Sequence, residues 1–254
     1  GGWTCFYQVG PASLGRYLDL GLSLLEVGEE AIVPLGGFTL DGPERRALRE
    51  GHHRAGRDGL GFRVAPASEV PTLLPALRRI SDSWLAETGV REKGFSLGFF
   101  DERYLREGPV ALVTSQGRLV AFANVWTSSA RAELSIDLMR NAADAPGGTM
   151  DFLFVSLLLW GRGEGYGAFN LGMAPPSGPD DRALTPLWSR LGARLYRHGE
   201  AFHDFEGLRQ YKEKFAPEWR PRYLAAPGGL RLPVVLANIA TLMARGAIAR
   251  SSPG

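Results

Sequence analysis

Two carboxylates and an arginine near the middle of the chain have the types and spacing of an acid–base site. Residues 131–139 alternate between polar and apolar side chains, which predicts one continuous β-strand with a buried face and an open face. Glu133 and Asp137 fall on the open face, about 13 Å apart at a rise of ~3.3 Å per residue. A carboxylate there can take a proton from an attacking hydroxyl or amine, or hold a substrate ammonium, whereas the alternative is an ordinary solvated sheet face. Arg140 follows at the strand exit and could pair with Asp137 or hold a phosphate.

A second group of candidate residues lies on a cationic helix closer to the end of the chain. Only three of the 29 basic residues are lysines, and two of these fall in or beside a helix predicted over residues 206–215. Arg209 and Lys212 are three positions apart and therefore share a face, with Tyr211 and Trp219 nearby. Guanidinium, ammonium and aromatic groups together can bind a phosphate and a nucleobase. The alternative is an ordinary charged helix.

One motif in the sequence is typical of serine hydrolases. Residues 94–98 match G-x-S-x-G, and Ser96, Asp137 and His198 follow the chain order of an α/β-hydrolase triad. A nucleophile elbow needs a strand immediately before the motif and a helix after it, but residues 90–93 are mostly charged. The flanking sequence therefore disfavours a hydrolase.

Two glycine-containing segments resemble phosphate-binding loops. Residues 161–167 follow a predicted helix and precede a strand, the reverse of the order that points amide groups at a phosphate, so they predict a helix end. Residues 140–149 lie where an acetyl-CoA enzyme would hold the pyrophosphate. There Pro146 removes an amide donor and Asp144 adds a negative charge, so an acyl-CoA donor is disfavoured.

Length and composition exclude several classes of protein. The 254 residues are 44% hydrophobic, enough for a substantial core, which excludes intrinsic disorder. A net charge of +2 gives no extended basic field, so any polyanion site must be local. One cysteine excludes an internal disulfide framework, and the four histidines lack metal-site spacing, so we expect no metal. Because no apolar run reaches the roughly 18–20 residues of a membrane span, we expect this piece to be soluble.

The order of predicted elements indicates an α/β (α+β) fold. Hydrophobic periodicity, caps and turn residues predict helices over 11–22, 43–57, 70–87, 149–160, 184–195, 206–215 and 232–249. They predict strands over 6–9, 31–35, 62–64, 110–114, 118–126, 131–139, 168–171 and 220–225, with a hairpin turn at 115–117. Asp41 and Thr149 are the predicted N-caps of the second and fourth helices. This is the layout of an N-acetyltransferase-like (GNAT-like) fold, whose mixed sheet is splayed open in the middle.

We predict tandem GNAT-like acyltransferase lobes, of which the first is incomplete. Residues 1–60 would be the C-terminal part of the first lobe, and 61–228 the second, catalytic lobe. Residues 229–254 would be a C-terminal amphipathic tail helix. This helix is apolar and flanked by arginines, so it could lie on an anionic membrane surface or pack against the protein.

Several segments together resemble the C-terminal catalytic region of the bacterial phosphatidylglycerol lysyltransferases, also called lysyl- and alanyl-phosphatidylglycerol synthases. The segments that carry the resemblance are Phe6–Val9, Tyr17–Gly21, Lys93–Gly98, Glu133–Arg140, Gly148–Phe154, Phe169–Pro175, Gly207–Phe215 and Pro221–Ala225.

The resemblance implies transfer of an amino acid, lysine or alanine, from aminoacyl-tRNA to a glycerol hydroxyl of phosphatidylglycerol. Because one ester replaces another, no cofactor is expected besides the aminoacyl-tRNA co-substrate. It also implies a first lobe that begins before Gly1, and an N-terminal multi-span membrane domain at the cytoplasmic face of the bacterial inner membrane. The implied catalytic residues are Asp137, Arg140, Lys212 and Glu133. The implied substrate-binding residues are Arg209, Lys214, Tyr211, Asn170 and Arg222.

Two other functions remain open at this stage. A Fem-like transferase would use aminoacyl-tRNA to build peptidoglycan bridges on the same double fold. A non-catalytic module would bind tRNA or a membrane without transferring anything.

Overall fold

The computed structural model describes residues 2–89, 98–174 and 205–244. Its helices are α1 (Leu14–Asp19), α2 (Arg46–Arg57), α3 (Val70–Thr88), α4 (Glu102–Leu105), α5 (Thr149–Gly163), α7 (Phe205–Glu213) and α8 (Leu232–Ala244). Its strands are β1 (Phe6–Val9), β2 (Ser23–Pro34), β3 (Leu60–Ala65), β4 (Val110–Ser115), β5 (Arg118–Asn124), β6 (Trp126–Thr127), β7 (Glu133–Ser135), β8 (Met139–Asn141), β9 (Ala168–Ala174) and β10 (Glu218–Ala226).

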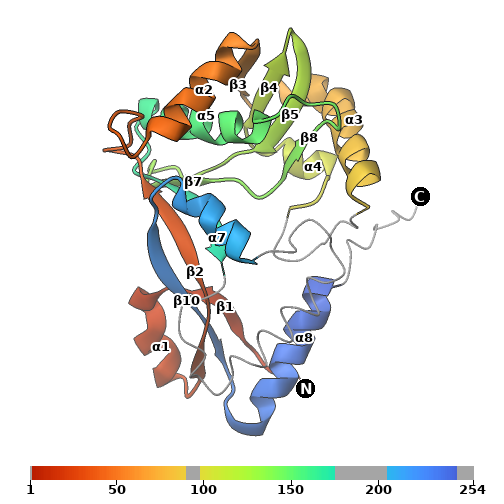
Figure 1. The fold of residues 1–254 in the computed structure, drawn as a ribbon. Helices are drawn as coiled ribbons and strands as arrows, with labels where there is room; N and C mark the ends of the chain where they lie inside the picture. Colours follow the sequence, from red (N-terminus) through yellow and green to blue (C-terminus); the bar gives the residue numbers. More distant parts are fainter. Residues whose placement is uncertain (1, 90–97, 175–204, 245–254) are drawn as a thin grey trace, which may run out of the picture.

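The strands form two sheets that share one hairpin. A six-stranded sheet has the order β1-β10-β2-β9-β7-β6, and a four-stranded sheet has the order β3-β4-β5-β8. All neighbours are antiparallel except β7 and β9, which run parallel. In Figure 1 the four-stranded sheet lies in the upper part with α2, α3 and α5, while β1, β2 and β10 extend into the lower part beside α1 and α8.

The shared hairpin changes sheet at Asn124. On one side of this residue β5 pairs with β8, and on the other side β6 pairs with β7. The Asn124 side chain occupies the gap, where its Oδ1 accepts hydrogen bonds from the backbone amides of Leu138 at 2.9 Å and Asp137 at 3.2 Å. Backbone amides that leave a ladder need another partner, and Asn124 supplies it. As a result β7 joins β9 while β8 stays with β5.

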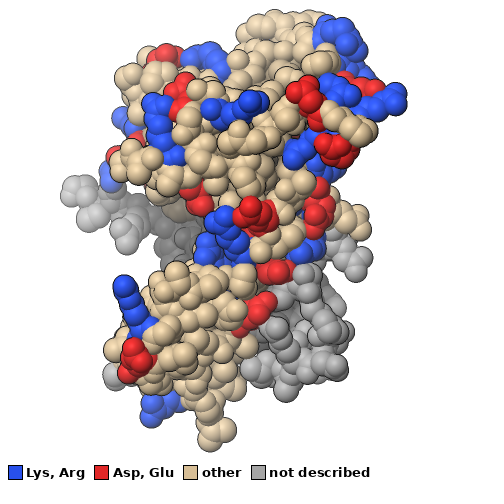
Figure 2. Space-filling model, turned by 90° about the vertical axis from the view of Figure 1, so that its left-hand side faces the viewer, with Lys and Arg blue, Asp and Glu red and all other residues tan. Residues whose placement is uncertain are grey.

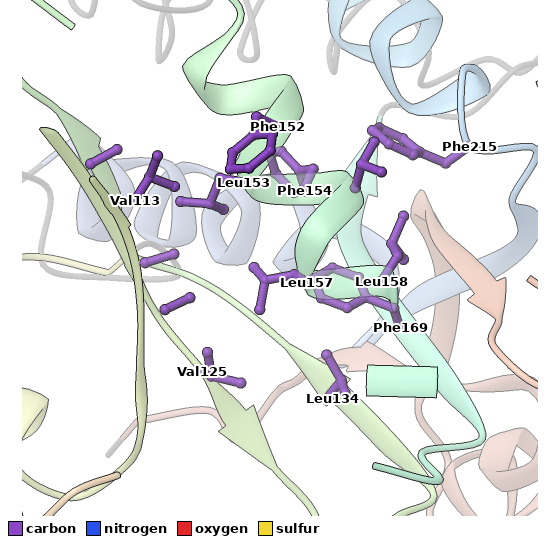
Figure 3. Packing of buried hydrophobic residues seen from close by; sticks show 14 of the residues in the cluster. Val113, Val125, Leu134, Phe152, Leu153, Phe154, Leu157, Leu158, Phe169 and Phe215 are labelled. Atoms are coloured by element: carbon purple, nitrogen blue, oxygen red, sulfur yellow. The ribbon is translucent and has the colours of Figure 1, made fainter. Parts of the chain in front are cut away.

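Helix α5 fills the space between the two sheets. Figure 3 shows Leu153 and Phe152 on the side of Val113, and Leu157 and Leu158 close to Phe169, on β9. These residues belong to one buried cluster that includes both sheets. A helix in such a position must be apolar all round, which explains its uniformly hydrophobic sequence. The four-stranded sheet buries its other face against α3.

The fold class predicted from the sequence is confirmed, including the splayed mixed sheet and the hairpin turn. In that turn Gln116 and Gly117 both have positive φ, at 49° and 79°, as a two-residue type I′ turn requires. The continuous strand predicted over 131–139 is wrong. It breaks into β7 and β8 at a bend around Asp137, where the chain passes from one sheet to the other. The predicted helix 184–195 lies outside the described residues.

Both predicted N-caps are wrong. Helix α5 follows Gly148, which has φ of 82° and is the N-cap residue, so Thr149 is already helical. Helix α2 follows Arg45, because the Asp41 carboxylate instead accepts a hydrogen bond from the Thr39 hydroxyl. Local hydrogen bonding of this kind competes with capping.

Sheet pairing crosses the boundary predicted at residue 60. β1 and β2 lie within residues 1–60, yet β1 pairs with β10, and β2 pairs with both β10 and β9 from the predicted lobe 61–228. One sheet therefore contains strands of both parts, and the division into lobes stays a prediction.

One side of the tail helix, α8, packs against the six-stranded sheet. Val235, Leu236 and Ile239 are buried against Leu224 and Ala226 of β10. Among the helices of the described ranges, none combines the length and the apolar character needed to cross a bilayer.

The packing of α5 predicts opposite effects for two glycines at its C-terminal end. A Cβ on Gly161 would lie 2.6 Å from Cδ2 of Leu134 and 3.0 Å from Cδ1 of Leu35, whereas one on Gly163 would meet no atom within 4 Å. We expect Gly161→Ala to lower the free energy of unfolding by about 1–3 kcal/mol. Gly163→Ala should raise it by up to about 1 kcal/mol. Urea denaturation measures both, and equal effects would contradict the packing.

Candidate functional site

The carboxylate of Asp137 is held at the bend between β7 and β8 by two neighbouring side chains. The Tyr104 hydroxyl of α4 donates to Oδ2 at 2.6 Å, and the Asn124 amide donates to Oδ1. Trp126 Nε1 in turn donates to the Tyr104 oxygen at 2.7 Å. Burial, followed by the hydrogen bond to Asp137, raises the pKa of Tyr104 well above its usual range, so this phenol remains a donor. Asp137 itself is exposed and can meet a substrate.

Gly98 leaves room for this carboxylate. A Cβ at position 98 would lie 2.9 Å from both the backbone carbon and the carboxyl carbon of Asp137. The last glycine of the G-x-S-x-G motif is therefore in close contact with the site. Ser96 and His198 lie outside the described residues.

A second cluster lies between β7, β9 and α7. The Asn170 amide donates to Oε1 of Glu133 at 3.2 Å, and the Asn170 Oδ1 accepts from the Gly172 backbone amide at 2.8 Å. Gly172 has φ of 80°, and its carbonyl accepts from Lys212 Nζ at 3.0 Å. Lys212 also donates to the Met173 carbonyl at 2.7 Å. The structure thus links Glu133, Asn170 and Lys212.

Lys212 is buried, with 5% of its surface exposed. This burial lowers its pKa to about 8, although the nearby Glu30 carboxylate acts in the opposite direction. The ammonium is thus close to losing its proton near neutral pH. Perturbed titratable groups of this kind are common in functional sites.

Two predicted substrate-binding arginines form ion pairs inside the protein. Arg209 pairs with Glu29 at 2.8 Å and stacks over the Trp219 ring at 3.8 Å, and Arg222 pairs with Glu30. These pairs join α7 and β10 to β2. On the face shown in Figure 2, charged residues of both signs gather where the molecule narrows, and the lower part carries few of them.

Tyr211 on α7 and Lys214 just beyond it both contact α5. Lys214 pairs with Asp151 at 3.5 Å and lies over the Tyr211 ring, 4.5 Å from its centre. Tyr211 packs into the core beside Phe215, where burial, with a smaller contribution from Asp151, raises its pKa.

Arg140 lies on β8, where it faces α3. Its guanidinium stacks over Trp84 at 4.1 Å, and its Nη1 donates to the Met139 carbonyl at 2.8 Å. The structure therefore places Arg140 against an aromatic ring of α3, and Lys212 between α7 and β9.

The sequence did not reveal four residues of these clusters: Tyr104, Asn124, Trp126 and Glu30. One signal was present, because Asn124 ends an otherwise apolar run in β5. Tyr104 and Trp126 carry no such signal, since only the tertiary structure brings α4 beside the bend at Asp137.

A separate hollow of about 560 Å³ lies between α2, β3 and α5. It is lined by His52, Phe62, Arg63, Val64, Ser156, Leu159 and Trp160. His52 Nε2 lies 3.0 Å from Ser156 Oγ, and burial, together with a smaller effect of His53, lowers the pKa of His52. None of the predicted site residues lines this hollow.

Comparison with known proteins gives one consistent family. The model of the family described as phosphatidylglycerol lysyltransferase, C-terminal, matches residues 1–226. The phosphatidylglycerol lysyltransferase of Bacillus subtilis strain 168 is 40% identical over 242 residues, which are 94% of this chain and 28% of that protein. The chain therefore spans little more than a quarter of the length of such relatives.

Solved structures agree with this match. The C-terminal domain of a putative lysylphosphatidylglycerol synthetase from Agrobacterium fabrum is similar with a TM-score of 0.85 at 43% identity, covering 100% of this chain and 76% of that one. L-PGS from Bacillus licheniformis is similar with a TM-score of 0.81 at 39% identity, covering 96% of this chain and 73% of that one. FemX shares the fold. Its TM-score is 0.56 at 9% identity, and the match covers 92% of this chain and 74% of FemX.

The buried Lys212 predicts a characteristic dependence of stability on pH. Its folded-state pKa of about 8 lies below the usual lysine pKa of 10.5, so the unfolded chain binds more protons between these values and stability rises with pH there. From pH 7 to pH 10 the free energy of unfolding of the wild type should therefore rise by about 2–3 kcal/mol relative to that of Lys212→Met. Urea unfolding at both pH values tests this.

Lys214→Met is the matched control, because Lys214 is nearly half exposed. The free energy of unfolding of Lys214→Met should change between the two pH values as that of the wild type does. A pH dependence in Lys212→Met identical to that of the wild type would contradict the burial of a titrating ammonium.

Proposed function

Because the chain belongs to the phosphatidylglycerol lysyltransferase family, through its C-terminal region, we propose that it transfers an amino acid from aminoacyl-tRNA to phosphatidylglycerol. The observation that carries the proposal is the exposed carboxylate of Asp137, fixed by Tyr104 and Asn124 at the splay of the sheets. The reaction takes place at the surface of an anionic membrane. In the full-length protein an N-terminal membrane domain holds this part there.

The transfer exchanges one ester for another. A glycerol hydroxyl oxygen attacks the carbonyl carbon of the aminoacyl ester, forming a new C–O bond. The bond from that carbon to the ribose oxygen of the tRNA breaks, and the hydroxyl proton ends on this ribose oxygen. Nothing is oxidised or reduced, so the step needs neither ATP nor a redox partner.

Asp137 is the proposed base that carries the proton. Each of its oxygens accepts one hydrogen bond from a fixed donor, which leaves other lone pairs free to accept the glycerol proton. The same carboxylic acid then gives the proton to the departing ribose oxygen. Tyr104, with Trp126 behind it, keeps the carboxylate in one orientation.

Lys212 is the proposed source of positive charge. An ammonium has three N–H donors, and the Gly172 and Met173 carbonyls take two of them. The third can stabilise the oxyanion of the tetrahedral intermediate or the lipid phosphate. Arg140, Arg209 and Arg222 are proposed to contribute to phosphate binding by tRNA or lipid, with Tyr211, Lys214 and Asn170 shaping the same region.

A transfer assay tests the function and the role of Asp137. The purified chain is incubated with lysyl- and alanyl-tRNA and with phosphatidylglycerol vesicles, and the chloroform extract is searched for aminoacylated lipid. Asp137→Asn should lower the transfer rate at least about 100-fold, since a positioned base contributes 10²–10⁴-fold. Asp144→Asn should leave the rate unchanged, because Asp144 is exposed and pairs with Arg118 at the start of β5.

Other outcomes assign other functions. Transfer to muropeptides, when these are offered beside the vesicles, with no aminoacylated lipid would indicate a Fem-like transferase, an activity that a shared fold at 9% identity does not support by itself. Salt-sensitive tRNA binding without any transfer, unchanged by Asp137→Asn, would indicate a binding module.

A further inference from the structure

We propose that Glu30 is a positioning residue that keeps Lys212 in its charged, ammonium form. The consequence for catalysis rests on the proposed function, in which Lys212 supplies positive charge to the reaction. The charge state itself is a property of the folded chain, so it can be measured without any transfer assay.

Sheet pairing places Glu30 near the ammonium. Glu30 on β2 lies opposite Met173 on β9, and the Met173 carbonyl accepts a hydrogen bond from Lys212 Nζ at 2.7 Å. The other acceptor of Lys212 is the carbonyl of Gly172, the preceding residue. Both acceptors are neutral, so neither balances the charge, and a buried charge needs a charged partner. Glu30, with 9% of its surface exposed, is the acid that favours the charged form of Lys212.

A second buried cation makes this carboxylate necessary. Arg222 on β10 forms an ion pair with Glu30, and its Nε is buried without a hydrogen-bond partner among the described residues. One acid therefore serves two cations, Arg222 and Lys212. Without the acid, both cations would share a site withdrawn from water. A guanidinium does not give up its proton, so Lys212 would lose its own.

The other acids around Lys212 have separate partners. They lie on α7 itself and on α5, β2 and β7: Glu29 pairs with Arg209, Asp151 pairs with Lys214, Glu213 accepts from Trp219 Nε1, and Glu133 accepts from the Asn170 amide. Glu213 and Asp151 are also about half exposed, so water and salt screen their charges. Glu30 is thus the acid whose loss should change the charge of Lys212.

The small number of lysines makes this charge directly measurable by NMR. Lysine labelled with ¹³C at Cε gives three signals, from Lys93, Lys212 and Lys214, and the signal absent from Lys212→Met belongs to Lys212. In the wild type this signal should titrate with a pKa of about 8. In Glu30→Gln the pKa of Lys212 should be lower by at least about 1 pH unit, because a nearby opposite charge shifts a pKa by roughly 1–3.

Arg222→Gln changes the same cluster in the opposite direction. It removes the competing cation and leaves Glu30 to Lys212 alone, so the pKa of Lys212 should rise. Glu213→Gln is the matched control, because it removes a half-exposed acid next to Lys212 in the sequence and should leave the pKa of Lys212 unchanged. The same Lys212 pKa in the wild type, Glu30→Gln and Arg222→Gln overturns the inference.

A transfer assay at two pH values tests the consequence for the reaction. A pKa lower by about 1 reduces the ammonium fraction of Lys212 about 5-fold at pH 8, but by only about a tenth at pH 6. The transfer rate of Glu30→Gln relative to the wild type should therefore fall about 5-fold between pH 6 and pH 8. A structural defect alone would lower the rate equally at both pH values.

The two measurements separate this inference from the proposed function. If the Lys212 signal moves as expected but the wild type transfers no amino acid, the proposed function is wrong and the role of Glu30 in the charge of Lys212 stands. If the wild type transfers and the ratio of the two rates is the same at both pH values, Glu30 is not a positioning residue for the reaction, and the inference is overturned.

Discussion

The hydrogen bonds from the Asn124 side chain to the backbone of Asp137 and Leu138 are the interaction on which the architecture depends. Two strands that separate inside a protein leave amides without partners, and such amides are costly when buried. One carboxamide satisfies both of them and also holds the Asp137 carboxylate. Asn124 therefore allows the two sheets to separate with α5 between them, and it orients the Asp137 carboxylate at the point of separation.

The splay also explains why the two polar clusters differ in character. Asp137 lies on the bend between β7 and β8, outside regular pairing, and is exposed with donors directed at both of its oxygens. Lys212 lies on the side of the six-stranded sheet, buried against the carbonyls of β9. An accessible carboxylate and a desolvated ammonium suit opposite tasks, namely proton transfer and stabilisation of charge. Strand β7, which carries Glu133, joins the two regions.

Much of the fold followed from the sequence because its signals are local. The apolar α5, the alternation in β4 and β5, and the Gln116-Gly117 turn each depend on nearby residues. The break between β7 and β8 did not follow, since the alternation continues through a bend that is set by pairing with two different sheets. Asp137, Glu133 and Lys212 were predicted as site residues by type and by resemblance, and their roles stay a prediction. Tyr104 and the burial of Lys212 depend on contacts between distant segments, which no local pattern records.

The pairing of β2 with β10 has a consequence for biosynthesis. Ser23 near the start of the chain lies opposite Ala226 near its end, and the register runs from there to Ile32 and Glu218. A ribosome that makes the chain in order therefore releases β2 long before its partner exists. During that interval its edge must be kept from pairing with other nascent chains, and the six-stranded sheet closes only once β10 has been made.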